Sequence, residues 1–265
     1  MENGRRIAVA QTTPVRGNVG ANIDQHLLLA RLAARQGARV VLFPELSLTG
    51  YELDLAADLG MREDSPVFGP LAEFAANHSV ILIVGAPIRR ESALYLGALI
   101  LYPDGRRELY TKQHLAAFRE QDAPDGVVPP PEASVFEPGQ HAPLVEFDGN
   151  VGALSVCYES MVASHPEAAA GRGARTYFSS QFGIPDHIAF KIAVLQKHAR
   201  RFGLLVPLAN FGGITGGLPA GGGSGFWSEQ GELLTQLPSA GAGVAVALEE
   251  AQGFRTWQTM IATGA

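Results

Sequence analysis

The sequence has little cysteine, no long apolar run and no excess of basic charge. Cys157 is the one cysteine in 265 residues, so the chain cannot form an internal disulfide and does not require an oxidising compartment. No segment approaches the roughly 20 apolar residues that span a bilayer, and the opening MENGRRIAVAQ lacks the apolar stretch of a secretory signal. The net charge of -6 argues against coating nucleic acid or an anionic membrane. We therefore expect a cytoplasmic protein whose partner is a small molecule.

Familiar motifs for phosphate, dinucleotide and metal binding are also missing. The glycine-rich stretch FGGITGGLPAGGGSG, residues 211–225, has no lysine after it and leads into a strand-like segment. It therefore fails as a phosphate loop and is better explained as a mobile or tightly turning loop. The seven histidines form no metal-binding pattern, and Ser224 lacks the closing glycine of a serine-hydrolase elbow. A metal site assembled from distant ligands stays open as an alternative, but no pattern in the sequence supports one.

What the sequence does contain is an alternation of strand-like and helical segments. The apolar runs RIAVAQTTP, ARVVLFP and SVILIVGAP read as strands, and PLAEFAANH reads as a helix. Another helix is predicted from about Asn22, where Asn22 and Gln25 have the spacing of a capping box, up to Gly37. This order, with short connections, predicts an α/β fold.

The second half of the chain continues the strand series after an irregular segment. The turn signal Pro103-Asp104-Gly105 lies between two strand-like runs and predicts a hairpin. A proline-rich, acidic stretch follows, from about His114 to Pro143. Further strands are predicted at GNVGALSVC, ARTYFSSQ, LLVPLAN, SGFWS and GVAVALE, and a helix at PDHIAFKIAVLQKHARR. With no linker and no internal repeat, we expect one domain over residues 1–265.

Three polar residues close apolar runs. Cys157 ends ALSVC, Glu45 ends ARVVLFPE and Lys112 ends RRELYTK. Each alone has an ordinary explanation, since a lone cysteine is most often an inert core residue and charges are common at strand ends. In α/β sheets, however, ligands gather beyond the carboxyl ends of strands. Together the three residues predict a shared site.

These segments resemble motifs of the nitrilase or carbon–nitrogen hydrolase superfamily. FPELSLTGYE resembles its first-glutamate motif, YTKQHL its lysine motif, and SVCYES with the following HPE, ending at Glu167, its cysteine motif. The resemblance implies a four-layer α-β-β-α sandwich with two mainly antiparallel central sheets. It also implies a homodimer or higher homo-oligomer, with the helix around Ala189 to Arg201 and the segment after Glu159 as candidate contacts.

The same resemblance implies a role for each site residue. Glu45 is expected to act as general base and Cys157 as nucleophile. Lys112 and the backbone N–H of Tyr158 are expected to stabilise the oxyanion. A second glutamate lies between lysine and cysteine in the family, and Glu120 and Glu132 compete for it here. EASVFEPG has the family spacing to an aromatic and Pro-Gly, which favours Glu132 as the residue that holds Lys112 or the substrate.

The implied reaction is hydrolysis of a small linear amide or N-carbamoyl compound through a thioester, with release of ammonia. This mechanism needs no metal and no organic cofactor. Glu159 stands where many amidases carry aspartate and resembles the true nitrilases, so nitrile hydrolysis is one alternative. A catalytically silent binding or regulatory relative is the other. Several side chains are candidates either for substrate contact or for core and surface positions: Phe118, Phe182, Phe211, Arg119 and Arg172.

Overall fold

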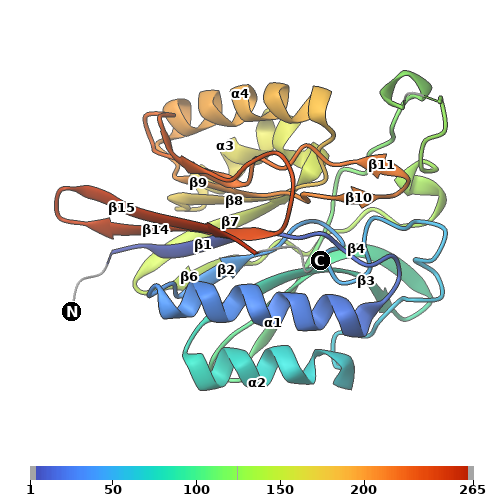
Figure 1. The fold of residues 1–265 in the computed structure, drawn as a ribbon, viewed down its shortest axis with the longest axis horizontal. Helices are drawn as coiled ribbons and strands as arrows, with labels where there is room; N and C mark the ends of the chain where they lie inside the picture. The colour runs from blue at the N-terminus through green and yellow to red at the C-terminus, as the bar shows by residue number, and fades with distance from the viewer. Residues whose placement is uncertain (1–3, 124, 262–265) are drawn as a thin grey trace.

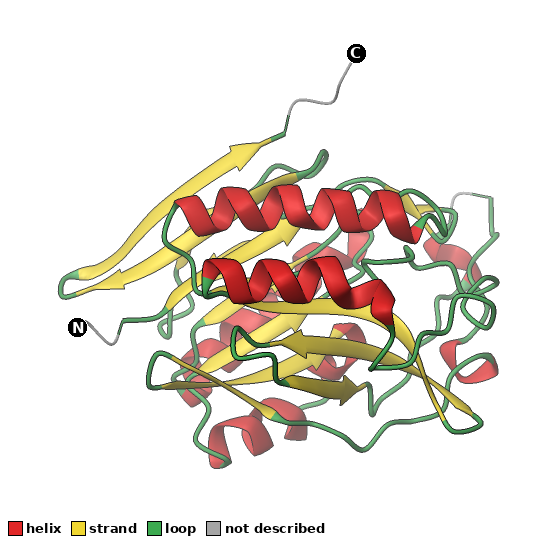
Figure 2. Ribbon diagram, turned by 90° about the horizontal axis from the view of Figure 1, so that it is seen from below, coloured by secondary structure: helices red, strands yellow, loops and turns green. Residues whose placement is uncertain are grey.

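Two stacked β-sheets lie between two pairs of helices in the computed structural model, which describes residues 4–123 and 125–261 (Figure 1). Helices α1 (Val19–Arg35) and α2 (Gly69–His78) cover the first sheet, and α3 (Ser164–Gly171) and α4 (Pro185–Phe202) cover the second. Figure 2 shows α1 and α2 side by side at the front. The predicted four-layer α-β-β-α sandwich is confirmed.

The sheets are mixed, with parallel strands at the centre and antiparallel strands outside. In the described ranges the first sheet runs in the order β15 (Gly253–Met260), β14 (Gly243–Glu250), β1 (Arg6–Gln11), β2 (Val40–Leu42), β3 (Ile81–Arg90), β4 (Ala93–Leu101), β5 (Arg107–Thr111). The second runs β13 (Leu233–Gln236), β12 (Gly225–Trp227), β9 (Val206–Ala209), β8 (Thr176–Ser180), β7 (Asn150–Val156), β6 (Leu144–Phe147).

Shorter elements complete the chain. A two-stranded ribbon pairs β10 (Ile214–Thr215) with β11 (Leu218–Pro219). In the part of the chain that the structure describes, four short 3-10 helices lie in the connections: η1 (Pro66–Phe68), η2 (Glu120–Asp122), η3 (Glu132–Ser134) and η4 (Cys157–Met161). None of the helices among the described residues combines the length and apolar character needed to cross a bilayer.

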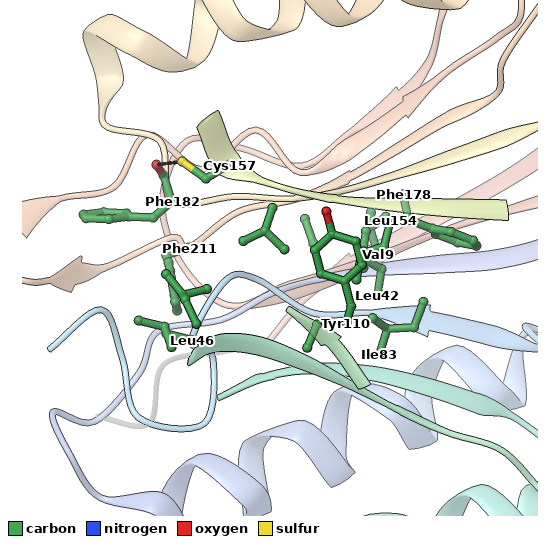
Figure 3. Close-up of a cluster of buried hydrophobic side chains, with 14 of the residues drawn as sticks. Val9, Leu42, Leu46, Ile83, Tyr110, Leu154, Cys157, Phe178, Phe182 and Phe211 are labelled. Carbon is green, nitrogen blue, oxygen red and sulfur yellow. Dashed lines mark hydrogen bonds between the residues drawn. The ribbon is translucent and has the colours of Figure 1, made fainter. Parts of the chain in front are cut away.

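The main core lies between the two sheets. Figure 3 shows side chains from both sheets meeting there, among them Val9, Leu42 and Ile83 from the first sheet and Leu154 and Phe178 from the second. Strands β1 and β2 read as nearly continuous apolar runs because the other sheet covers one face and helices cover the other. Removal of apolar surface from water stabilises a folded protein by about 25 cal/mol per Å². The apolar side chains between the sheets therefore contribute strongly to the free energy of folding.

Two details of the fold differ from the prediction. Helix α1 begins at Val19, and Asn18 caps it by accepting a hydrogen bond from the Ala21 N–H. Asn22, predicted as the cap, lies inside the helix, where its buried side chain bonds the Val15 N–H at 2.7 Å and the Leu48 carbonyl at 3.0 Å. The capping-box spacing was misleading because this asparagine serves a tertiary contact.

The strand series was also incomplete. Strand β15 pairs with β14 over its whole length, in the hairpin that projects at the side of the molecule in Figure 1. Its sequence GFRTWQTM contains no buried apolar run, because most of its side chains are exposed or half-exposed. Tertiary pairing, and not local pattern, makes this segment a strand.

The segments expected to form a subunit contact lie on the outer side of the second sheet. Tyr158, on η4, is 47% exposed, and Phe190, on α4, is 65% exposed. Phe190 lies in the first of the two predicted contact segments, whereas Tyr158 comes just before the second, which follows Glu159. The homodimer stays a prediction.

Strand direction explains how distant motifs meet. Strand β2 is parallel to β3, and β5 runs the same way because β3, β4 and β5 are successively antiparallel. The residues that follow β2 and β5 therefore lie at one edge of the first sheet. In the second sheet β7 is parallel to β8, so the residues after them also share an edge. The Ser180 hydroxyl donates to the Phe43 carbonyl at 2.9 Å and joins the two edges.

Candidate active site

Glu45 lies in a tight turn directly after β2 and is 1% exposed. The next residue, Leu46, has a φ of 52°, in the left-handed region that side chains seldom adopt. Strand β3 passes so close that a Cβ on Gly85 would lie 2.3 Å from the Leu46 nitrogen. Glycine at this position is what allows the turn to hold the carboxylate inside the molecule.

Lys112 follows β5 and is completely buried. Its ammonium donates to Glu45 Oε1 at 2.6 Å and to Glu132 Oε1 at 2.8 Å. Its backbone is held by the Gly139 N–H, which donates to the Lys112 carbonyl at 2.7 Å. A Cβ on Gly139 would lie 2.3 Å from Thr111 Oγ1, so the Pro-Gly of the EASVFEPG segment permits this approach.

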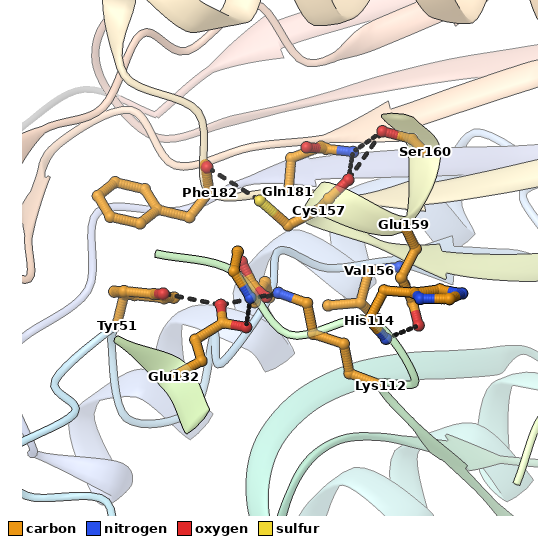
Figure 4. A network of polar contacts seen from close by, with 12 residues as sticks. Tyr51, Lys112, His114, Glu132, Val156, Cys157, Glu159, Ser160, Gln181 and Phe182 are labelled. Carbon is orange, nitrogen blue, oxygen red and sulfur yellow. Dashed lines mark hydrogen bonds and ion pairs between the residues drawn. The ribbon is translucent and has the colours of Figure 1, made fainter. Parts of the chain in front are cut away.

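Glu132 is the second carboxylate on Lys112. It is 1% exposed, and its Oε1 also accepts from the Tyr51 hydroxyl at 2.7 Å. Its Oε2 accepts from the Ala116 N–H at 2.7 Å, and Figure 4 shows this network below the cysteine. Glu120, the competing residue, is exposed on η2. The structure thus brings Glu132, and not Glu120, to the lysine.

Replacement of Glu132 by glutamine is expected to lower kcat on the order of 10²-fold. The change removes one of two charges that fix the Lys112 ammonium, and small displacements of such a group are costly. Steady-state kinetics would measure the effect. The matched variant Glu120→Gln is expected to keep turnover within about twofold. Equal losses in both variants, or a loss only in the second, would contradict the assignment.

Cys157 directly follows β7 and begins η4, in a strained backbone conformation with a φ of 50°. Such strain costs about 1–3 kcal/mol and is concentrated at functional sites. The thiol is 6% exposed, and its Sγ lies 3.4 Å from the Phe182 carbonyl (Figure 4). The ammonium of Lys191 approaches the same sulfur to 2.9 Å. The Tyr158 N–H belongs to the first turn of η4, where N–H groups lack partners within their own helix.

Glu159 connects the cysteine turn to the lysine strand. Its Oε2 accepts from the Val156 N–H at 2.7 Å and from the Tyr110 hydroxyl at 2.6 Å. Its Oε1 accepts from the Gln113 N–H at 2.6 Å, one residue after Lys112. This completely buried carboxylate ties the backbones of the two motifs together. The longer glutamate, in place of the aspartate common in amidases, therefore has a structural use here.

Electrostatics set the protonation of the site. Burial alone lowers the pKa of Lys112, but Glu132 and Glu45 raise it more, so the side chain remains an ammonium. Burial raises the pKa of Glu45 to about 7, against the opposing effect of Lys112. Burial and then Glu45 raise the pKa of the Cys157 thiol, while Lys191 and Lys112 lower it. Within the described ranges, Glu45 Oε2 is a buried oxygen without a hydrogen-bond partner and can accept a proton.

Activity is expected to rise with pH through about 7. Only the carboxylate form of Glu45 can act as base, and its raised pKa of about 7 means that this form is lost as the pH falls below that value. We expect kcat/KM to fall about tenfold per pH unit on the acidic side and to level off above the midpoint. The measurement is a pH profile with circular dichroism at each pH as a control for folding. A flat profile down to about pH 5 would show that Glu45 is not the titrating base.

An aromatic cluster lies beside the thiol. The Tyr51 and Phe182 rings are 4.8 Å apart, and Phe118 lies 5.3 Å from Phe182. Phe211 is completely buried and contacts Phe182 from the other side. Of the predicted pocket residues, half-buried Phe118 thus joins the site border, while Phe182 and Phe211 are core residues next to it.

The candidate arginines do not contact the site. Arg119 pairs with Asp122 and is 68% exposed at its side chain. Arg172 donates to the Ala142 carbonyl at 2.9 Å, on the outer side of the second sheet. Among the described residues, neither guanidinium forms a hydrogen bond or ion pair with Cys157, Lys112, Glu45 or Glu132.

The glycine-rich segment 211–225 is mostly buried, turns tightly through the β10–β11 ribbon and borders the first-glutamate motif. The Thr215 hydroxyl accepts from the Tyr51 N–H at 2.7 Å, and the Gly216 N–H donates to Glu52 at 2.9 Å. Of the two alternatives for this segment, the structure therefore favours the tight turn.

Four further residues contact the site residues in ways that the sequence did not predict. Tyr51 and Glu159 lie within quoted motifs, but their partners follow only from the fold. No sequence pattern indicated a role in the site for Lys191 or Gln181, because they belong to a helix and a loop outside the motifs. Throughout residues 4–123 and 125–261, no three histidine, cysteine or acidic side chains are grouped to hold a metal ion.

Comparisons with known proteins agree with this arrangement. The family described as Carbon-nitrogen hydrolase matches residues 6–258. The chain is 27% identical over 175 residues to an aliphatic nitrilase of Rhodococcus rhodochrous, covering 59% of this chain and 44% of that protein. It is 28% identical over 117 residues to a glutamine-dependent NAD(+) synthetase of Mycobacterium tuberculosis, covering 43% and 17%. The chain thus spans less than half the length of these relatives.

Solved structures give a match over most of the fold. The NitN amidase of Nesterenkonia sp. AN1 has a TM-score of 0.80 at 26% identity, with 91% of each chain covered. A mutant of that amidase, with the acetamide moiety of fluoroacetamide added covalently at its active-site cysteine, matches with a TM-score of 0.80 at 25% identity, covering 91% of this chain and 89% of the other.

The chain therefore belongs to the carbon–nitrogen hydrolase family. Both the predicted family and the enzyme class that it defines are confirmed.

Proposed function

We propose that the protein hydrolyses a small linear amide or N-carbamoyl compound through a thioester on Cys157 and releases ammonia. The observation that carries this proposal is the convergence of Glu45, Lys112 and Glu132 in one buried network beside the strained, buried cysteine. The similarity to an amidase whose cysteine reacts with amide reagents supports it.

The first half of the reaction forms the thioester. Only a few per cent of a free thiol is thiolate at neutral pH, so the nucleophile needs a base. Glu45 takes the proton from Cys157, and the sulfur attacks the carbonyl carbon. The resulting oxyanion is stabilised by Lys112 and the Tyr158 N–H, each donor contributing on the order of 3 kcal/mol. Glu45 then protonates the leaving nitrogen, and ammonia departs.

The second half regenerates the enzyme. Glu45, again a carboxylate, takes a proton from water, and the hydroxide attacks the thioester carbonyl. The same donors stabilise the second oxyanion. The carbon–sulfur bond then breaks, the proton held by Glu45 returns to the Cys157 thiolate, and the acid product leaves. Glu132 keeps the Lys112 ammonium in position throughout, through the 2.8 Å contact between them. The aromatic rings of Tyr51 and Phe118 at the border of the site suit a small apolar acyl group.

Nitrile hydrolysis is the second candidate. The similarity to an aliphatic nitrilase supports it, as does the glutamate at position 159. A nitrile would be attacked at carbon by the same sulfur, and the thiol proton would pass through Glu45 to the nitrile nitrogen, which gives a thioimidate. Addition of one water would release ammonia and leave the thioester, and a second water would release the acid.

Ammonia release from short amides, ureido acids and nitriles, each supplied separately to the purified protein, would test both candidates. We expect the highest kcat/KM among amides or ureido acids. Release from nitriles alone would favour the second candidate. Folded protein that releases ammonia from none of the three classes would contradict both.

A further inference from the structure

Lys191 is a second lysine at the proposed nucleophile. It lies two turns into α4, outside every motif, and is half-buried. Its ammonium donates to Cys157 Sγ at 2.9 Å, to Gln181 Oε1 at 3.2 Å and to the Phe182 carbonyl at 3.2 Å. An ammonium has three protons, so these three acceptors account for all of them and fix the group against the sulfur.

The charge environment of Lys191 differs from that of Lys112. Lys112 is held between two carboxylates at 2.6 and 2.8 Å. Among the ion pairs of the part of the chain that the structure describes, none involves Lys191. Its acceptors are an amide oxygen, a backbone carbonyl and the sulfur. Among the described residues no carboxylate therefore lies within ion-pair distance of Lys191, although its charge lowers the pKa of Glu45 from farther away.

We propose that Lys191 is a catalytic residue that stabilises the thiolate of Cys157. This inference rests on the proposed function, because it assigns a role in the same reaction. When the S–H bond breaks, the proton goes to Glu45 and the electron pair stays on Sγ, 2.9 Å from the ammonium. The charge leaves the sulfur as the S–C bond forms. After water has added to the thioester, the tetrahedral adduct collapses and the S–C electron pair returns to Sγ. Lys191 stabilises this leaving thiolate as well, until it takes back the proton held by Glu45.

The position of Lys191 separates this role from that of the oxyanion donors. Lys112 reaches the site from the first sheet, whereas Lys191 reaches it from the helix layer that covers the second sheet. A carboxylate on the substrate is a less suitable partner, because all three protons of Lys191 already have acceptors. The electrostatic effect of Lys191 on the thiol also exceeds that of Lys112 in lowering its pKa.

The test is the pH dependence of alkylation by iodoacetamide, followed by mass spectrometry. Because Cys157 is the one cysteine of the chain, the label reports this thiol alone. In Lys191→Met the midpoint of the profile is expected to move upward by about one pH unit or more, so that alkylation at neutral pH falls roughly tenfold. The kcat for a short uncharged amide should fall by a similar factor, with little change in KM. Lys191→Arg keeps the charge and should retain most of both.

Lys197→Met is the matched control, since Lys197 is an exposed lysine on the same helix. It should leave both measurements unchanged. An unaltered alkylation profile in Lys191→Met would overturn the inference. So would a rise in KM confined to amides that carry a carboxylate, which would make Lys191 a substrate-binding residue. If Lys191→Met does not fold by circular dichroism, Lys191→Gln replaces it with the same expected shift.

The two proposals fail in different ways. If Cys157→Ala keeps turnover, the proposed function itself is wrong. If Cys157→Ala is inactive while Lys191→Met behaves like wild type in alkylation and kcat, only the role of Lys191 is wrong.

Discussion

Cys157→Ala is expected to release no ammonia from any amide that the wild-type protein hydrolyses. Alanine retains the backbone and most of the side-chain volume at this 6% exposed position, so the fold should persist, but no atom remains to form the thioester. The loss should reach the detection limit of the assay, because an unassisted amide is hydrolysed many orders of magnitude more slowly. Ammonia release and thermal unfolding, measured on the same preparation, would check both statements.

Tyr158→Phe is the matched control for this prediction. Tyr158 is the next residue, and only its backbone N–H is expected to act, so removal of the hydroxyl should leave turnover within about twofold. Ammonia release by a folded Cys157→Ala protein would rule out the thioester mechanism. Absence of release from wild type as well would favour a silent relative of the family.

Lys112→Met is expected to reduce kcat by about 10² or more. Loss of one oxyanion donor has this magnitude, and the substitution also leaves Glu45 and Glu132 together without their shared cation. Breaking a buried ion pair by removing one partner costs about 3–5 kcal/mol, so the melting temperature should fall as well. Single-turnover kinetics on protein shown to be folded at the assay temperature would isolate the chemical step.

Lys197→Met again provides the comparison, since it removes the same charge from an exposed site. It should alter neither kcat nor the melting temperature appreciably. A folded Lys112→Met protein with near-normal kcat would show that Lys112 does not stabilise the oxyanion. A raised KM with kcat unchanged would instead assign it to ground-state binding.

The second glutamate illustrates how far the motifs could lead. The spacing in EASVFEPG favoured Glu132 over Glu120, and the fold brings Glu132 to the lysine while Glu120 stays exposed. Local signals failed for the start of α1, because Asn22 has tertiary partners, and for β15, because a half-exposed strand carries no buried apolar run. The sequence also did not indicate that Lys191 contacts the thiol, because a lysine on an amphipathic helix is usually a solvated residue.

The sequence by itself determined the family, the sandwich architecture and the order of Glu45, Lys112 and Cys157 at the ends of apolar runs. The family was identified from the resemblance of three motifs, and the sandwich was what that resemblance implied. The order of the three residues is a local feature, because an apolar run and its closing residue can be read without knowing what they pack against. Only the tertiary structure decided that both carboxylates share one ammonium, that Glu159 joins two motifs and that Lys191 reaches the sulfur. Those contacts depend on strand direction and on the stacking of two sheets, which bring together residues far apart in the chain.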